Sequence, residues 1–338
     1  MEFLRRRIGL ILQALVSALI IAYLIRIVDW RTVWSNVQTM EPGWIVAAFF
    51  CFAPGLVIVS WRWRMLLAVH GVHLPFRRIF ELTMIGQFFS AIGVGTTGGD
   101  VIKIFYTARA VPHRRAAVAF TIIVDRVIGL IALLLFGVIL SIPKLPLLLS
   151  HPETRTATGS FYFFAAGGAV ASLLACIGPF VMKSQTLRAL IKKLPLVRRG
   201  ASLFMAYEVT ARAYRTNLLA VVGSLPSHVC GTMMGYCVIL AMGLHPDLLT
   251  TLAIIAMVNM LIALPVSLNG LGFREGLYIW FLDLLHIDKE HALAFSLTCF
   301  VLTLLWSLVG GPFYFLYRHE THTPPPNVAE VEPIFSER

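Results

Sequence analysis

The chain alternates between long apolar runs and short basic segments. Runs long enough to cross a bilayer as helices of about 20 residues lie near 8–28, 43–60, 114–141, 160–182, 217–243 and 291–317. Two further apolar stretches, about 79–111 and 249–287, are interrupted by glycine-rich turns. The pattern predicts an all-α polytopic integral membrane protein with about eight hydrophobic segments.

The two interrupted stretches carry glycines at matching offsets. These are Gly93, Gly95 and Gly99 in the first stretch and Gly270, Gly272 and Gly276 in the second. A helix break inside an apolar segment frees backbone groups that lipid cannot hydrogen-bond. It is therefore tolerated only where protein buries it or where it lines a wet cavity. Paired breaks in the two halves of a chain are typical of a transporter binding site.

The distribution of basic residues indicates whether the interrupted stretches cross the membrane. If both are re-entrant hairpins and the N-terminus is cytoplasmic, about 20 of the 28 basic residues fall in inner loops and about five fall outside. Arg62 and Arg64 are counted in one inner loop, and the basic segment 109–115 lies in another. A single full crossing by each stretch would move 109–115 outside. The sequence therefore predicts six full spans and two re-entrant helical hairpins.

This topology has a consequence for the organisation of the chain. Residues 1–141 and 142–318 each hold three spans with a hairpin before the third, and an odd number of spans gives the halves opposite orientations. We therefore expect a single transmembrane domain built as an inverted-topology repeat. The segment 29–42 resembles an outer interfacial stretch with an aromatic belt, and 184–216 contains an amphipathic cytoplasmic helix. The tail 319–338 is expected to be disordered and cytoplasmic.

Composition agrees with a membrane protein. Hydrophobic residues make up 58% of the chain and charged residues only 13%, against roughly 25% charged in soluble domains. The net charge of +11 comes from basic residues between apolar runs, which indicates anionic lipid headgroups as partners and no nucleic acid. No cysteine or histidine spacing resembles a metal site, and no nucleophile set is present. We expect no cofactor, no metal and no enzymatic activity.

Six charged residues are expected at membrane depth, in or next to the two hairpins: Asp100, Lys103, Asp125, Arg126, Arg274 and Glu275. A charge at the centre of a membrane helix costs about 2.5–3.5 kcal/mol on insertion scales. These side chains must therefore face protein, water or one another. Asp125 shares a helix face with Gly129 and Ala132, a small-residue face suited to close helix contact. Arg126 lies on the bulkier side.

Two interpretations of these charges stay open. In the structural one, Asp125 and Arg126 pair with Arg274 or Asp100 and only fix the packing. In the functional one, basic side chains and hairpin backbone bind an anionic lipid headgroup, because a guanidinium fork suits phosphate and helix N-termini add positive dipole ends. The candidate headgroup contacts are Arg126, Arg274, Lys103, Gly98, Gly99, Gly270 and Gly272. The carboxylates of Asp100, Asp125 and Glu275 would then be charge partners or would carry protons.

Three motifs resemble the lysylphosphatidylglycerol synthase transmembrane family, the flippase-like membrane domain of multiple peptide resistance factors. They are the runs 98–103, 116–130 and 264–276, and the resemblance covers about residues 5–318. It implies a stand-alone member that moves a modified or isoprenoid-type anionic lipid between leaflets of a bacterial inner membrane. Lys103 stands where many relatives are expected to have arginine.

The resemblance does not extend to lipid synthesis. Multiple peptide resistance factors carry a cytosolic aminoacyl-transferase domain after the membrane part, whereas only about twenty residues follow the last predicted span here. We therefore expect that the chain does not synthesise aminoacyl lipid, although a separately encoded lipid-modifying enzyme could be its partner. The alternative is a non-transporting accessory or scaffold subunit of an envelope lipid or lipid-linked glycan pathway. Both termini are expected in the cytoplasm.

Overall fold

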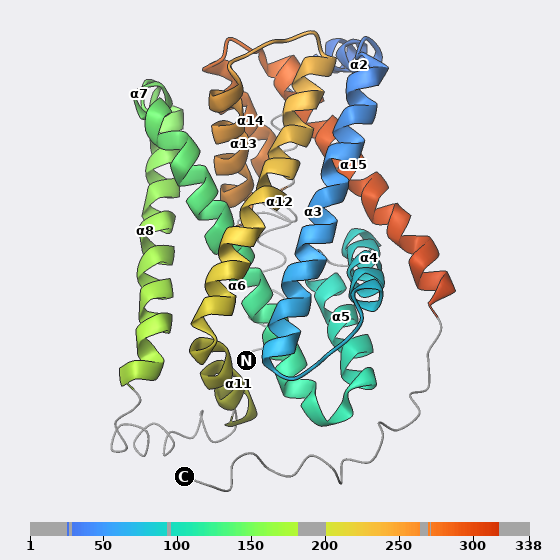
Figure 1. Cartoon of the computed structure of the whole chain (residues 1–338). Coiled ribbons are helices and arrows are strands. Elements are labelled where there is room, and N and C mark those ends of the chain that lie inside the picture. The colour runs from blue at the N-terminus through green and yellow to red at the C-terminus, as the bar shows by residue number, and fades with distance from the viewer. Residues whose placement is uncertain are drawn as a thin grey trace, which may run out of the picture.

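The computed structural model describes residues 26, 29–92, 96–181, 201–263, 270 and 272–317. Every regular element in these ranges is a helix (Figure 1). The long helices are α3 (Pro42–Val69), α6 (Arg115–Ser141), α8 (Pro152–Val181), α12 (Tyr214–Ala241) and α15 (Lys289–Leu316). The hairpin helices are α4 (Phe76–Ile92), α5 (Thr96–Ala110), α13 (Leu248–Ile262) and α14 (Phe273–Asp283). The connecting elements are α2 (Trp30–Gln38), η1 (Pro112–Arg114), η2 (Ile142–Lys144), α7 (Leu145–Leu148) and α11 (Ala201–Arg212).

The predicted fold class is confirmed. Among the described residues, four helical segments are long and apolar enough to cross a membrane: Pro42–Val69, Pro112–Leu148, Tyr214–Ala241 and Lys289–Leu316. A fifth helix, α8, has 30 residues and is long enough to cross by its length. The chain is an all-α polytopic membrane protein. The predicted first span 8–28, most of the predicted amphipathic helix and the tail 319–338 lie outside the described residues.

One predicted boundary is wrong. The second span was expected to end near residue 60, with Arg62 and Arg64 in an inner loop, but α3 continues to Val69. Hydropathy falls at the two arginines, but the helix continues through them. The protein buries the Arg62 side chain, and the Arg64 side chain lies on the exposed face. Arg62 is therefore another buried charge within a helix long and apolar enough to cross a membrane.

Each interrupted stretch forms two helices that pack on each other, α4 with α5 and α13 with α14. The two pairs lie toward opposite ends of the bundle (Figure 1). The contacts between halves are reciprocal: α3 packs on α12 and runs in the opposite direction, α4 packs on α15, and α13 packs on α6. The predicted inverted-topology repeat would place the helices in this way, and it stays a prediction.

Small residues allow these reciprocal contacts. A Cβ at Gly310 of α15 would collide with the carbonyl oxygen of Met84 in α4. A Cβ at Gly137 of α6 would lie at an ordinary van der Waals distance of 3.8 Å from the Cβ of Ala256 in α13, and its closest approach, 2.8 Å, would be to the Phe161 ring of α8. Met84 and Ala256 occupy matching positions, each eight residues after the first residue of its helix. Each hairpin thus packs on the last long helix of the other half, and this packing encloses the centre of the bundle.

Candidate functional site

A cavity of about 330 Å³ lies at the centre of the bundle. Its lining comes from α3, α4, α5, α6, α12 and α13. The charged side chains and the histidine in the lining are Arg62, Asp100, Lys103, Asp125, Arg126 and His228. Four of the predicted membrane-depth charges therefore meet in one cavity, together with Arg62, which the sequence had placed in a loop.

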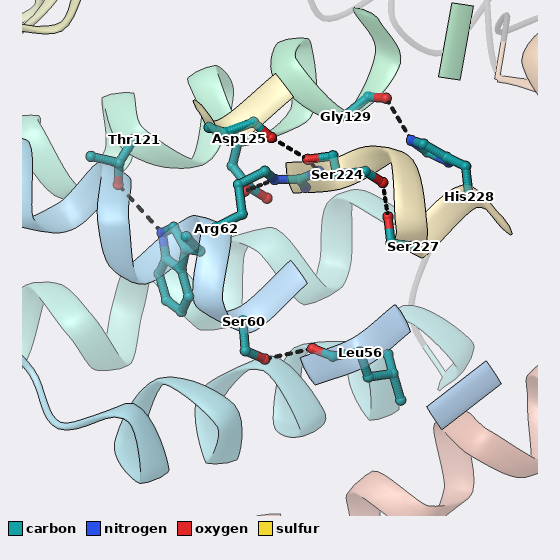
Figure 2. Close-up of polar contacts among 11 residues, drawn as sticks. Leu56, Ser60, Arg62, Thr121, Asp125, Gly129, Ser224, Ser227 and His228 are labelled. Atoms are coloured by element: carbon teal, nitrogen blue, oxygen red, sulfur yellow. Dashed lines mark hydrogen bonds and ion pairs between the residues drawn. The ribbon is translucent and has the colours of Figure 1, made fainter. Parts of the chain in front are cut away.

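Arg62 and Asp125 form a buried ion pair between α3 and α6 (Figure 2). Arg62 Nε donates to Asp125 Oδ1 at 2.7 Å, and the Nη1 group of the same guanidinium donates to Ser224 Oγ of α12 at 3.0 Å. A buried charge needs such a partner and additional hydrogen bonds, because the low dielectric of the interior penalises it otherwise. One side chain thus joins three long helices.

The small-residue face of α6 makes room for this pair. A Cβ at Gly129 would lie 3.2 Å from Nη1 of Arg62, and the Gly129 carbonyl oxygen faces His228 Nε2 at 3.1 Å (Figure 2). The predicted close-contact face of Asp125, Gly129 and Ala132 therefore contacts an arginine. The signal that could have found Arg62 was the buried carboxylate itself, since Asp125 requires a cation.

Asp100 and Arg126 form the second ion pair of the cavity, one of the pairings that the sequence left open. Arg126 Nε donates to Asp100 Oδ2 at 2.8 Å and so links α5 to α6. The side chain of Arg126 is 47% exposed, and its neighbours on α6, Ile123 and Leu130, are also exposed. This pair lies at the edge of the cavity, where the cavity meets the outer surface of the bundle.

Lys103 differs from the other charges of the cavity. The residue is only 7% exposed, and no hydrogen bond or ion pair to its Nζ is found among the described residues. Its stem crosses Gly86 of α4, where an added Cβ would lie 2.9 Å from Cγ and Cδ of the lysine. Nζ lies 4.1 Å from the ring centroid of Trp63, a cation–π contact that offsets part of the desolvation.

The glycines of the first hairpin serve packing as well as the cavity. A Cβ on Gly99 would collide with the carbonyl oxygen of Gly86, so the two hairpin helices touch backbone to backbone at this point. Gly99 also lines the cavity. Gly98, partly buried, lies in the same first turn of α5 but is not a lining residue.

The second hairpin holds its charges in a separate cluster. Arg274 Nε donates to Glu275 Oε1 at 3.0 Å and to Ser296 Oγ of α15 at 2.9 Å. Glu275 Oε2 accepts the backbone N–H of Gly272 at 2.7 Å. Neither residue lines the central cavity. The two predicted headgroup arginines, Arg126 and Arg274, are therefore not brought together.

The turn before α14 accounts for its glycines. Gly270 and Gly272 have φ values of 77° and 81°, in the left-handed region that favours glycine. The Glu275 carboxylate occupies the N-terminus of α14, where a substrate anion was expected. Among the described residues of this hairpin, Asn259 of α13 lines the cavity, and its Oδ1 accepts from Tyr278 Oη at 3.3 Å.

A second cavity, of about 370 Å³, lies at the end of the bundle where α3 ends and α6 begins. His70, His113 and Arg114 are its polar lining residues. Arg114 donates to the His70 carbonyl oxygen, and His70 Nε2 lies 2.9 Å from Thr210 Oγ1. Because His70 and Arg114 are engaged and the cavity is at the end of the bundle, the central cavity is the stronger candidate.

The chain was compared with known proteins and protein families. The model of one family, described as the lysylphosphatidylglycerol synthase TM region, matches residues 10–311. A search of curated proteins found no match. The matched range includes both hairpins and every lining residue of the central cavity. The chain therefore belongs to the lysylphosphatidylglycerol synthase TM region family.

Proposed function

We propose that this protein is a lipid translocase that moves an anionic, modified or isoprenoid-type lipid between the leaflets of a bacterial cytoplasmic membrane, without catalysing a reaction. The observation that carries the proposal is Arg126. Its guanidinium is half exposed beside a polar cavity, eleven residues after the first residue of the membrane helix α6. At 1.5 Å per residue this places it roughly 16 Å along the helix, near the middle of a bilayer core of about 30 Å.

The surroundings of Arg126 suit a molecule that is polar at one end and apolar at the other. Lys103, Asp100 and Arg62 lie on the cavity side. On the outer side, Val101 and Phe105 of α5 and Val127 of α6 are exposed apolar residues. A headgroup could occupy the cavity while its tails stay in the bilayer along α5 and α6. A guanidinium binds phosphate in two-pronged geometry, so Arg126 is the headgroup contact we favour.

The charge partners of the arginines have defined roles in this proposal. Asp100 orients Arg126, and Asp125 holds Arg62 at the back of the cavity. Either carboxylate could carry a proton when its arginine binds substrate instead. Arg274 and Glu275 would stabilise the second hairpin rather than contact the same headgroup.

The orientation of the bundle follows from its basic residues. The end where α3 ends, α6 begins and α11 lies carries Arg78, Arg109, Arg114, Arg115 and Arg212. By the positive-inside rule this end faces the cytoplasm. The opposite end carries exposed Trp30 and Trp34 of α2, which suit the outer interface.

Reconstitution tests the proposal. The purified chain would be placed in liposomes with fluorescent phosphatidylglycerol, and the label reached by a membrane-impermeant quencher would be followed over time. Arg126→Ala should slow lipid movement by about tenfold or more, as expected for loss of a charged contact worth at least about 1.4 kcal/mol. Arg155→Ala, at an exposed arginine of α8, is the matched control and should leave movement unchanged.

Two results would contradict the proposal. Folded wild-type protein that moves no lipid would favour the accessory or scaffold role. Equal movement by wild type and a folded Arg126→Ala variant would remove Arg126 as the headgroup contact.

A further inference from the structure

We infer that the central cavity selects a lipid whose headgroup carries one net negative charge, a phosphodiester, and that Lys103 Nζ contacts this headgroup beside Arg126 and recognises its charge. The inference rests on the proposed function in placing the headgroup in this cavity. It adds the charge of the headgroup and the residue that reads it. The balance of charge among the described lining residues supports it.

The formal charges of the acidic and basic lining residues do not cancel. The cavity has three basic side chains, Arg62, Lys103 and Arg126, and two acidic ones, Asp100 and Asp125. Each carboxylate is in an ion pair with an arginine, at 2.7 Å for Arg62–Asp125 and 2.8 Å for Arg126–Asp100. One positive charge, that of Lys103, remains in excess. A single negative charge in the ligand would neutralise the cavity.

Lys103 is placed to meet a ligand and not to stabilise the empty protein. It is more than nine-tenths buried and lines the cavity. A buried ammonium that forms no ion pair is destabilising, and its contact with the Trp63 ring offsets only part of the desolvation. Functional groups held at a cost to stability are typical of binding sites.

The geometry around Lys103 keeps the ammonium in this position. Its stem passes over Gly86, where any side chain would displace it, and the hairpin backbone at Gly99 closes on the same glycine. Trp63, fully buried, contacts the ammonium through its ring. The excess positive charge of the cavity limits the headgroup classes that fit. An aminoacylated phosphatidylglycerol with a net positive charge would add to the excess charge, and a zwitterionic headgroup would leave it uncompensated.

Ligand binding measured without transport tests the inference. The full chain in neutral detergent would be titrated with short-chain phosphatidylglycerol, phosphatidylcholine and lysyl-phosphatidylglycerol, and with inorganic phosphate. Both Kd and the thermal unfolding midpoint would be recorded. We expect phosphatidylglycerol to bind at least about tenfold more tightly than the other two lipids and to raise the midpoint. An equal response to inorganic phosphate would overturn the assignment to a lipid.

Variants of Lys103 separate a ligand-binding role from a structural one. Lys103→Met should raise the unfolding midpoint of the ligand-free protein, because it removes an unpaired buried charge, and should abolish the preference for phosphatidylglycerol. Lys103→Arg should keep the preference. Lys144→Gln, at a lysine near the opposite end of α6 that pairs with Asp247, is the control and should keep it too. An unchanged preference in Lys103→Met, or a lower midpoint without ligand, would overturn the inference.

The outcome is distinguishable from that of the proposed function. Charge-selective binding through Lys103 without lipid movement in liposomes would support the inference and contradict translocation. Lipid movement with no preference for headgroup charge would support translocation and overturn the inference.

Discussion

Arg62 Nε and Asp125 Oδ1 lie 2.7 Å apart in the middle of the bundle, although 63 positions separate them in the chain. Both side chains are almost fully buried, and the same guanidinium reaches Ser224 of α12. The pair therefore fixes the positions of α3 and α6 relative to α12 at the level of the cavity. The pair is a structural contact, and because its two charges cancel it adds no net charge to the cavity.

Breaking this pair should destabilise the protein strongly. Arg62→Met leaves the Asp125 carboxylate buried without a cation, and loss of one partner of a buried pair costs about 3–5 kcal/mol. Asp125→Asn leaves Arg62 in the same situation and should be about as damaging. Thermal unfolding in detergent, followed by tryptophan fluorescence, would measure both effects. Arg64→Met, at an exposed arginine of the same helix, should change the midpoint little, and equal effects at 62 and 64 would contradict the assignment.

The sequence predicted the helices of this fold better than the side-chain contacts between them. Long apolar runs predicted α6, α8, α12 and α15 because hydropathy over about 20 residues is a strong signal. Glycines marked both hairpins because a helix break exposes backbone groups that lipid cannot hydrogen-bond, so it must lie inside the protein. Arg62 was misplaced because hydropathy counts an arginine as leaving the membrane. It does not register a carboxylate 63 residues away that compensates for the burial of the charge.

The candidate site was predictable in part. The pairing of Asp100 with Arg126 was one of the alternatives that the sequence left open, and the structure brings both to the cavity with Lys103 and Asp125. The separation of Arg274 from this group could not be predicted. Its carboxylate partner is the next residue in the chain, and adjacent helix residues ordinarily point about 100° apart. Only the long side chains and Ser296 of α15 bring the two charges together.

Two glycines, Gly310 in the α15–α4 contact and Gly276 in α14, should respond in opposite ways to substitution by alanine. Gly310→Ala places a Cβ against the carbonyl oxygen of Met84, and backbone cannot move aside, so we expect a loss of about 1–3 kcal/mol. Gly276→Ala in α14 meets nothing within 4 Å and should be neutral or stabilising by up to about 1 kcal/mol, since alanine favours a helix. Unfolding midpoints of the two variants test this. A Gly310→Ala midpoint at or above the wild-type value would show that the helices can separate without loss.

Glu275 should stabilise the second hairpin through two separable contacts. Glu275→Gln removes the charge that faces Arg274 but keeps an oxygen that can accept the Gly272 N–H, whereas Glu275→Ala removes both. The alanine variant should therefore be less stable than the glutamine variant by about 1 kcal/mol, the usual value of an N-terminal cap. Hydrogen exchange of α14 amides and the unfolding midpoint would report the difference. Equal values for both variants would mean that the carboxylate acts only as the partner of Arg274.

The stability of the end of the bundle where α13 begins should depend on pH through Asp247, the N-cap of this helix. Hydrogen bonds from Thr250, followed by the Lys144 ammonium at 2.9 Å, lower the pKa of this carboxyl to about 2. Because the unfolded value is about 3.9, the folded state is stabilised at and above about pH 4, and this stabilisation is lost as pH falls through 2. The side chain is 53% exposed, so solvent screening limits the effect to about 1 kcal/mol or less. Because pH acts on the whole protein, the measurement is the midpoint of wild type minus that of Asp247→Asn, which keeps a capping side chain but has no charge. We expect the wild-type midpoint to exceed that of Asp247→Asn at pH 6 and the two midpoints to converge near pH 2. If the difference between them does not change with pH, Lys144 and Thr250 do not stabilise the ionised carboxylate.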